Sequence, residues 1–205
     1  MAPDIAERNT PYRKVQKFHH PFTALPEQNN GTSPPIFYPI IKTMAEHLDI
    51  SNGTKSEKYA TLLPQIAAVV EVETDLIARM ANVAAMIHET FGFLWTGFYR
   101  VESAGGQLIL GPFQGPMACT RIKHGRGVCG KAWSEGRTLV VPDVEAFPGH
   151  IACSSSSRSE IVVPLWKDGE IVGVLDIDSA DLATFDATDA RHLEEIAALV
   201  TDDAK

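Results

Sequence analysis

The stretch EIVVPLWKDGEIVGVLDID, residues 160–178, decides how this chain folds. It holds two apolar runs rich in β-branched residues, Glu160–Trp166 and Glu170–Asp178, separated by Lys-Asp-Gly. Apolar runs on either side of a short, glycine-containing segment are typical of a β-hairpin. The stretch therefore predicts an antiparallel pair of strands at the centre of a sheet.

Three carboxyl groups lie on this hairpin. Asp176 and Asp178 are two residues apart, so their side chains share one face of the strand. A three-residue loop ending in glycine would be a type I turn with a bulge. It would pair Trp166 with Glu170 and place Glu160 directly opposite Asp176, whereas a two-residue loop would turn Glu160 to the other face. We expect the longer loop, and therefore three carboxyl groups on one patch.

Such a cluster predicts a binding site as well as a strand end. Like charges directly opposed in a sheet are destabilising, so a cation or a shared proton is expected to relieve them. A substrate ammonium group would supply the cation. Crowding should also raise the pKa of one carboxyl, which leaves a proton donor near neutral pH.

Helices and further strands are expected on both sides of the central sheet. Apolar residues recur at helical spacing over Leu62–Val70, where Pro64 should lie near the helix start, and over Leu76–Thr90 with Thr74 as N-cap. A last helix should begin near Asp186. Strands are predicted at residues 94–101, 107–113 and 138–141, with a short helix at 128–135. This order predicts an α+β fold with a central antiparallel sheet flanked by helices.

The N-terminal part of the chain differs from the rest. The first 40 residues hold seven of the 13 prolines, at positions 3, 11, 21, 26, 34, 35 and 39, and show no apolar period. We therefore expect residues 1–54 to form a Pro-rich extension, an arm or partly disordered, and residues 55–205 to form one domain.

Composition excludes several classes of protein. The net charge is −8, from 18 basic and 26 acidic residues, which disfavours a broad nucleic-acid or anionic-membrane surface. No run approaches the roughly 18 apolar residues of a membrane-spanning helix, and the polar N-terminus lacks a signal-peptide pattern. We expect a reducing, cytoplasmic location, where an odd number of cysteines indicates thiols rather than a disulfide framework.

The three cysteines are Cys119, Cys129 and Cys153, all in glycine-rich or loop segments. Cys129 stands where a helix should begin, and a helix N-terminus favours the thiolate. Together they indicate redox chemistry. A zinc site that adds His124 and His150 can be drawn, but the sequence lacks the paired ligand spacing of structural zinc sites, so we expect no metal.

Long strings around the cysteines resemble one known family. The sequences LILGPFQGPMACTRIKHGRGVCGKA, VVPDVEAFPGHIACSSSSRSEIVVPL and EIVGVLDIDS are similar to those of the free methionine-(R)-sulfoxide reductases, which are GAF-domain proteins. The likeness covers about residues 57–201. It implies a GAF-like domain that reduces the R epimer of free methionine sulfoxide with cysteine thiols. It also implies that no cofactor is needed, that thioredoxin regenerates the enzyme, and that the protein is a homodimer.

The resemblance also implies a role for each candidate residue. Cys153 matches the attacking cysteine, Cys119 the cysteine that resolves the sulfenic acid, and Cys129 a third thiol that replaces or assists Cys119. The pocket carboxylates match Glu160, Asp176 and Asp178, and the aromatic wall matches Trp95 and Tyr99. We expect Glu160, with Asp178, to bond the sulfoxide oxygen, and Asp176 to bind the ammonium group.

Two positions depart from the family pattern, and two other functions stay open. Ser154 follows the attacking cysteine where the family usually has aspartate, and Arg158 stands where asparagine is common. A GAF-type sensor of a small molecule or of redox state would share the fold without catalysis. A structural zinc protein is the third alternative.

Overall fold

The computed structural model describes residues 47–102, 106–151 and 155–202. All of them belong to the compact unit Ile40–Lys205. The extension expected over residues 1–54 therefore lies outside the described residues, apart from 47–54. Within the described helices, none is both long and apolar enough to cross a membrane.

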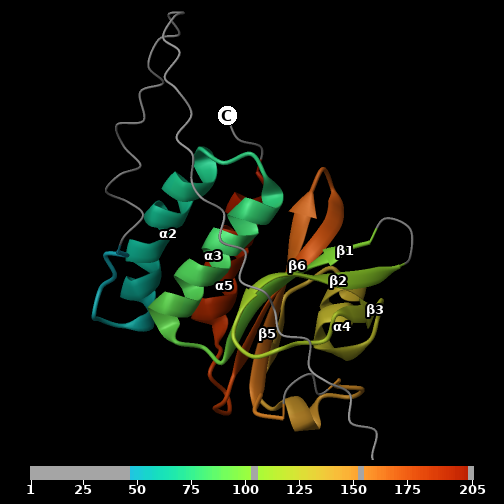
Figure 1. The fold of residues 1–205 in the computed structure, drawn as a ribbon. Coiled ribbons are helices and arrows are strands. Elements are labelled where there is room, and N and C mark those ends of the chain that lie inside the picture. Colours follow the sequence, from blue (N-terminus) through green and yellow to red (C-terminus); the bar gives the residue numbers. More distant parts are fainter. Residues whose placement is uncertain (1–46, 103–105, 152–154, 203–205) are drawn as a thin grey trace, which may run out of the picture. The chain divides into compact units, whose positions relative to one another are not determined.

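A six-stranded antiparallel sheet forms the centre of the fold, as the sequence predicts (Figure 1). The spatial order is β3-β2-β1-β6-β5-β4, so the two strands of the deciding hairpin lie inside the sheet. The strands are β1 (Trp95–Val101), β2 (Gln107–Gln114), β3 (Arg121–Lys123), β4 (Leu139–Val141), β5 (Ser159–Lys167) and β6 (Glu170–Ser179).

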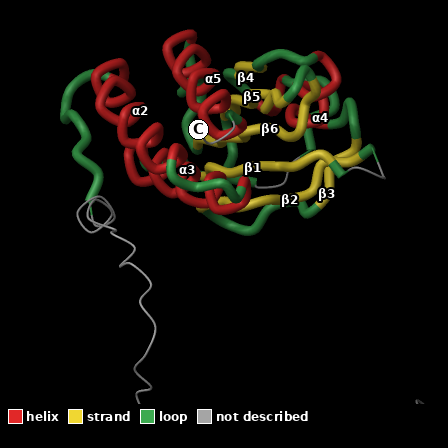
Figure 2. Tube along the Cα trace, turned by 90° about the horizontal axis from the view of Figure 1, so that it is seen from above, coloured by secondary structure: helices red, strands yellow, loops and turns green. Residues whose placement is uncertain are grey.

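Helices cover the two faces of this sheet unequally (Figure 2). Three long helices, α2 (Lys55–Glu71), α3 (Leu76–Phe91) and α5 (Ala187–Thr201), pack on one face around a large apolar core that includes Leu62, Ile87 and Leu175. The short helix α4 (Gly127–Glu135) covers the other face over a smaller core. This second layer also includes the single-turn 3₁₀ helix Val144–Ala146, and it is where the candidate site lies.

The residues at the helix termini show how the local sequence determines where the long helices begin and end. Thr54 is the N-cap of α2 and forms a capping box with Glu57. Asp186 is the N-cap of α5, which confirms the predicted start of that helix. Helix α3 is capped by Asp75 rather than the expected Thr74, because the Asp75 carboxylate accepts a hydrogen bond from the amide of Ala78. Gly92 ends α3 with φ of 66°, a left-handed conformation that glycine adopts without strain.

The expectation for Pro64 is wrong. It lies in the middle of α2 rather than near the start of the helix. Proline removes one backbone hydrogen bond there. Tyr59, Leu62 and Ile66 are fully buried on the same helix, and their packing holds the segment in one continuous α-helix despite that loss.

The hairpin turn differs from the predicted one. Asp168 and Gly169 both have positive φ, 53° and 81°, which is the pattern of a two-residue type I′ turn. That turn alone would carry Glu160 to the other face of the sheet. A β-bulge beside Leu165 adds one unpaired residue and reverses the effect, so Glu160 pairs with Asp178 instead of Asp176. The predicted register is therefore wrong, while the predicted common face is right.

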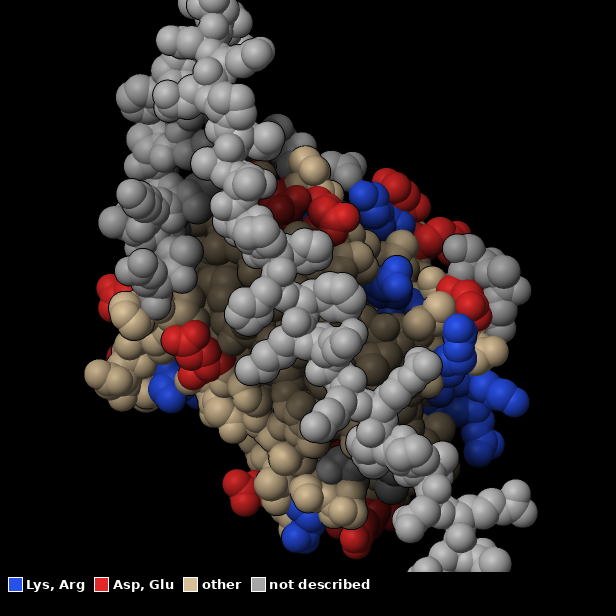
Figure 3. Space-filling view, viewed as in Figure 1, with Lys and Arg blue, Asp and Glu red and all other residues tan. Residues whose placement is uncertain are grey.

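Charged groups join the N-terminal ends of α2 and α5. The Lys55 ammonium lies 3.0 Å from the Asp186 carboxylate and 2.5 Å from that of Asp189. Asp189 is fully buried and also accepts a 3.0 Å hydrogen bond from the Tyr59 hydroxyl. Where grey atoms do not cover the face in Figure 3, it carries charged side chains of both signs.

Candidate active site

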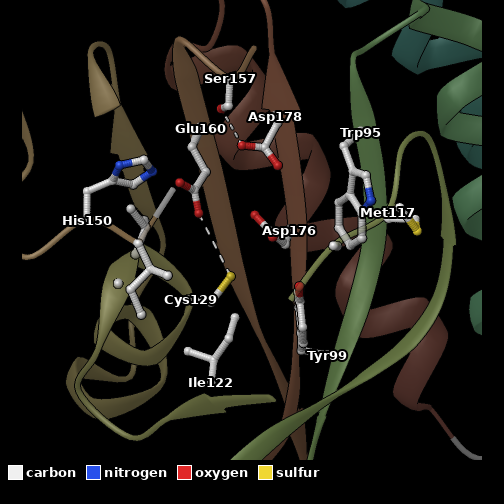
Figure 4. Close-up of a pocket in the computed structure, with 14 residues that line it drawn as sticks. Trp95, Tyr99, Met117, Ile122, Cys129, His150, Ser157, Glu160, Asp176 and Asp178 are labelled. Carbon is white, nitrogen blue, oxygen red and sulfur yellow. Dashed lines mark hydrogen bonds between the residues drawn. The ribbon is translucent and has the colours of Figure 1, made fainter. Parts of the chain in front are cut away.

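A pocket opens between the α4 side of the sheet and the loops beside it (Figure 4). Strands β1, β5 and β6 form its floor, and the N-terminal end of α4 forms one wall. The lining residues are Trp95, Tyr99, Met117, Ala118, Ile122, Gly127, Val128, Cys129, His150, Ile151, Ser157, Glu160, Asp176 and Asp178. Eight of these fourteen residues carry an aromatic ring, an imidazole, a thiol, a hydroxyl or a carboxyl group.

The three carboxyl groups gather in this pocket. Glu160 and Asp176 are each 6% exposed, and Asp178 is partly buried. Figure 4 shows their side chains pointing toward one another from the neighbouring strands β5 and β6. The gathering predicted from the sequence is confirmed, because the type I′ turn and the bulge together leave all three on one face.

Burial and mutual repulsion hold protons on this cluster. Burial, followed by the charges of Asp176 and Asp178, raises the pKa of Glu160 well above its ordinary value. Burial and the charge of Asp178 likewise raise the pKa of Asp176. Burial raises the pKa of Asp178 to about 6, against a lowering effect of the hydrogen bond from Ser157. At neutral pH, Asp178 is therefore the ionised member and Glu160 a proton donor.

One oxygen of the cluster is unsatisfied. Asp176 Oδ1 is buried and accepts no hydrogen bond from the residues that the structure describes. An unpaired acceptor in a buried place is unfavourable, so the oxygen is a strong site for an external donor. A ligand with several N–H bonds, such as an ammonium group, meets that requirement.

Cys129 is the third residue of α4 and lies on the wall that this helix forms. Its sulfur is 3.8 Å from Glu160 Oε1, within hydrogen-bond reach for a thiol. Burial, then the negative charges of Asp176 and Glu160, raises the pKa of this thiol well above its usual range. The expectation that the helix N-terminus would favour a thiolate here is wrong, because burial and two carboxylates outweigh the helix dipole.

Aromatic residues form the wall opposite the carboxyl groups. The rings of Trp95 and Tyr99 stack with centroids 5.9 Å apart, and both are almost fully buried. Trp95 Nε1 donates a 3.1 Å hydrogen bond to the carbonyl of Pro116, and the Tyr99 hydroxyl donates one of 3.0 Å to that of Cys119. The aromatic wall therefore also anchors the loop that carries Cys119, a role that the sequence analysis missed.

A glycine allows the indole to lie along the strand. A Cβ atom on Gly97 would stand 2.4 Å from Cβ of Phe113 and 2.5 Å from the outer ring edge of Trp95. Real Cβ contacts are never that short, so a side chain at this position would displace the wall. Trp95 also stacks on Phe113, with centroids 5.3 Å apart.

The structure places two of the three cysteines. Cys119 is partly buried in the loop between β2 and β3, beside Met117, which is 91% exposed. Cys129 is buried in α4. Cys153 lies outside the described residues, so the structure does not test its predicted role.

Two further residues line the pocket: Ser157, which the sequence analysis missed, and His150, which it named only as a possible zinc ligand. The hydroxyl of Ser157 donates a hydrogen bond to Asp178, and His150 lies partly buried at the pocket wall with a pKa lowered by burial. Ser157 is one of several serines in a row, and only its distance from Glu160, three residues, could have singled it out.

The donor atoms of Cys129, Glu160 and Asp176 all lie within 4.8 Å of one another, the one such group among the described residues. A metal would require the thiolate of Cys129, which burial and the carboxylates disfavour, so protons or an ammonium ion fit this group better. The zinc set drawn from the sequence gains no support at His124, whose ring lies edge-on against Trp133.

Comparison with known proteins identifies the family. Residues 75–201 match the GAF domain model. "GAF domain-containing protein A" of Dictyostelium discoideum is 57% identical over 157 residues, covering 77% of this chain and 99% of that protein. "Free methionine-R-sulfoxide reductase" of Saccharomyces cerevisiae is 40% identical over 164 residues, covering 76% and 91%.

Solved structures agree with that result. The free methionine-R-sulfoxide reductase from Neisseria meningitidis, solved in complex with its substrate, superposes with a TM-score of 0.74 at 56% identity. It covers 76% of this chain and 93% of that one. The residues that the GAF domain model matches, 75–201, include all six strands of the sheet and helix α4. The chain therefore belongs to the GAF-domain family of free methionine-R-sulfoxide reductases.

Proposed function

We propose that this protein reduces free methionine-R-sulfoxide to methionine. One observation carries the proposal: a buried carboxyl cluster that retains protons, with one unsatisfied oxygen, faces an aromatic wall across a small pocket. Such a pocket supplies an acid for the sulfoxide oxygen, an acceptor for an ammonium group and an apolar surface for a methyl group. The relative solved with its substrate supports the same choice.

Substrate binding would use three sides of the pocket. The ammonium group donates to Asp176 Oδ1, the acceptor that lacks a partner among the described residues. The methyl-sulfinyl end packs against Trp95 and Tyr99. The substrate carboxylate is expected at the start of α4, where Gly127 and Val128 line the pocket and helix amides point outward.

The chemistry begins at the sulfoxide oxygen. Neutral Glu160 donates a hydrogen bond and then a proton to that oxygen, which makes the sulfur more electrophilic. We do not assign this donor role to Asp178, although the sequence led us to expect it. With a pKa of about 6 it is mostly ionised at neutral pH, and its charge helps to hold the proton on Glu160.

Two cysteines would carry the two electrons. The Cys153 thiolate attacks the activated sulfur, methionine leaves, and the oxygen stays on Cys153 as a sulfenic acid. The Cys119 thiol condenses with it, which forms a disulfide and releases water. Thioredoxin then reduces this disulfide by thiol exchange and becomes oxidised itself. Cys129 is a weaker candidate for the resolving role, because its thiol is buried and its pKa is raised.

The direct test is an epimer-resolved assay. Purified protein is incubated with dithiothreitol and racemic free methionine sulfoxide, and both epimers are followed over time. Loss of the R epimer alone, with peptide-bound sulfoxide untouched, is the expected result. If neither epimer disappears while three thiols titrate, the reductase function is wrong and the sensor alternative stands.

Cysteine variants separate the proposed steps. Cys153→Ser should abolish methionine formation. Cys119→Ser should still form one methionine per chain in a single-turnover experiment but lose rapid recycling by thioredoxin. The Cys129→Ser variant should still be regenerated by thioredoxin, because Cys129 takes no part in the proposed disulfide. Normal turnover by Cys153→Ser would overturn the assignment of the attacking thiol.

The wider setting is proposed in the same way. We expect residues 1–46 of the extension to be dispensable for the reduction, the protein to act in the cytoplasm, and the chain to form a homodimer. Light scattering on a sizing column measures the last of these. A truncation that starts at His47, the first described residue, tests the first by retaining or losing activity.

A further inference from the structure

We propose that Ser157 is a positioning residue that keeps Asp178 oriented and ionised. This inference rests on the proposed function. Ser157 is 8% exposed, and its hydroxyl donates a 2.5 Å hydrogen bond to Asp178 Oδ1 (Figure 4).

The backbone after Ser157 is held on both sides. The amide of Arg158 donates a 2.7 Å hydrogen bond to the carbonyl of Ser179 on β6, and the carbonyl of Arg158 accepts one from the amide of Val144. The hydroxyl of Ser159 donates to the carbonyl of Asp181 at 2.6 Å. Ser157 therefore directly precedes a segment whose position is fixed by hydrogen bonds, and this holds its hydroxyl beside Asp178.

The hydrogen bond selects which carboxyl carries the charge. A hydroxyl that donates to a carboxylate favours its ionised form. Of the three clustered carboxyl groups, Asp178 accepts such a bond from serine, and the bond lowers its pKa against the raising effect of burial. The charge on Asp178 repels a second charge nearby, and this repulsion keeps the proton on Glu160, the donor in the proposed reaction.

Other groups around Asp178 do not replace this bond. The groups that line the pocket around it are the carboxyls of Glu160 and Asp176, the thiol of Cys129, the phenol of Tyr99 and the imidazole of His150. The carboxyls and the thiol would add negative charge, the pKa of Tyr99 is raised by burial, and that of His150 is lowered. Among these described groups, none supplies a positive charge at neutral pH.

The test compares Ser157→Ala, Ser157→Thr and the control Ser155→Ala. Ser155 lies in the same loop and is exposed, outside the pocket lining. Without the hydroxyl, the acid limb of the pH profile of kcat/KM should move up by about one pH unit, the tenfold effect of a hydrogen bond to a charged group. At pH 6 the loss should appear mainly as a higher KM, because protonation of Asp178 removes a negative charge near the ammonium group that Asp176 Oδ1 binds.

The expected result is a shifted limb in Ser157→Ala, restoration in Ser157→Thr and no change in Ser155→Ala. A uniform loss of activity across pH in Ser157→Ala, or an unshifted limb, overturns the proposal. A second readout does not depend on activity: NMR titration of the Asp178 carboxyl carbon should give a higher pKa in Ser157→Ala. If wild type reduces no sulfoxide, the proposed function fails, while this titration still decides the role of Ser157.

Discussion

Replacing Asp178 with asparagine should make the protein more stable at neutral pH while it damages the site. The pKa of Asp178 rises from 3.8 in the unfolded chain to about 6 in the fold, chiefly because of burial. At about 1.4 kcal/mol per pH unit, this difference costs the folded state up to about 3 kcal/mol once the carboxyl is ionised. Asparagine has the same shape, carries no charge and still accepts the hydrogen bond from Ser157.

The pH dependence follows from the sign of the shift. A raised pKa contributes stability that is fully present below the unfolded value and is lost as pH rises through about 6. The gain from Asp178→Asn should therefore reach up to about 3 kcal/mol at pH 7.5 and fall to about 0.5 kcal/mol at pH 4. The substitution also removes the repulsion between Asp178 and the carboxyls of Glu160 and Asp176, which likewise increases the stability of the folded state.

Urea unfolding under reducing conditions, followed by tryptophan fluorescence at both pH values, measures this difference. Asp181→Asn is the matched control, because Asp181 is an exposed aspartate three residues further along, and its change should stay within about 0.5 kcal/mol at either pH. A loss of stability in Asp178→Asn at pH 7.5 would refute the reasoning. An equal gain at both pH values would also do so, because a desolvated charge cannot produce it.

Three further changes have expected outcomes. Glu160→Gln should lower kcat by roughly 10²-fold or more, because the amide cannot transfer a proton, and steady-state kinetics at pH 7 measures it. Gly97→Ala should cost about 1–3 kcal/mol of stability and raise KM, because its Cβ would collide with Phe113 and displace the indole; an unchanged urea midpoint would contradict the close packing. Tyr59→Phe should lower the free energy of unfolding by about 1–3 kcal/mol, because it removes the hydrogen bond that the Tyr59 hydroxyl donates to the buried Asp189. Thermal unfolding measures the loss, and Tyr99→Phe, whose hydroxyl bonds the Cys119 carbonyl instead, is the control that leaves the α2–α5 contact intact.

Much of the fold follows from short-range pattern. The hairpin, the helix that ends at Gly92 and the helix that begins at Asp186 were predicted from apolar period and capping residues, which act within a few positions. Strand β3 was missed, because three residues are too few to show a period. Pro64 was misplaced, because long-range packing of α2 outweighs a local penalty.

The candidate site, like the fold, has features that local sequence predicts and features that only tertiary packing decides. Alternation along β6 predicted that Asp176 and Asp178 share a face, and both line the pocket together with Glu160. The roles that the motif strings imply for the cysteines stay predictions. Only the tertiary structure decided the partner of Glu160, because the type I′ turn and the bulge beside Leu165 each shift the register by one residue. Only the tertiary structure decided that Cys129 stays protonated, because burial depends on what packs around a residue and not on its neighbours along the chain.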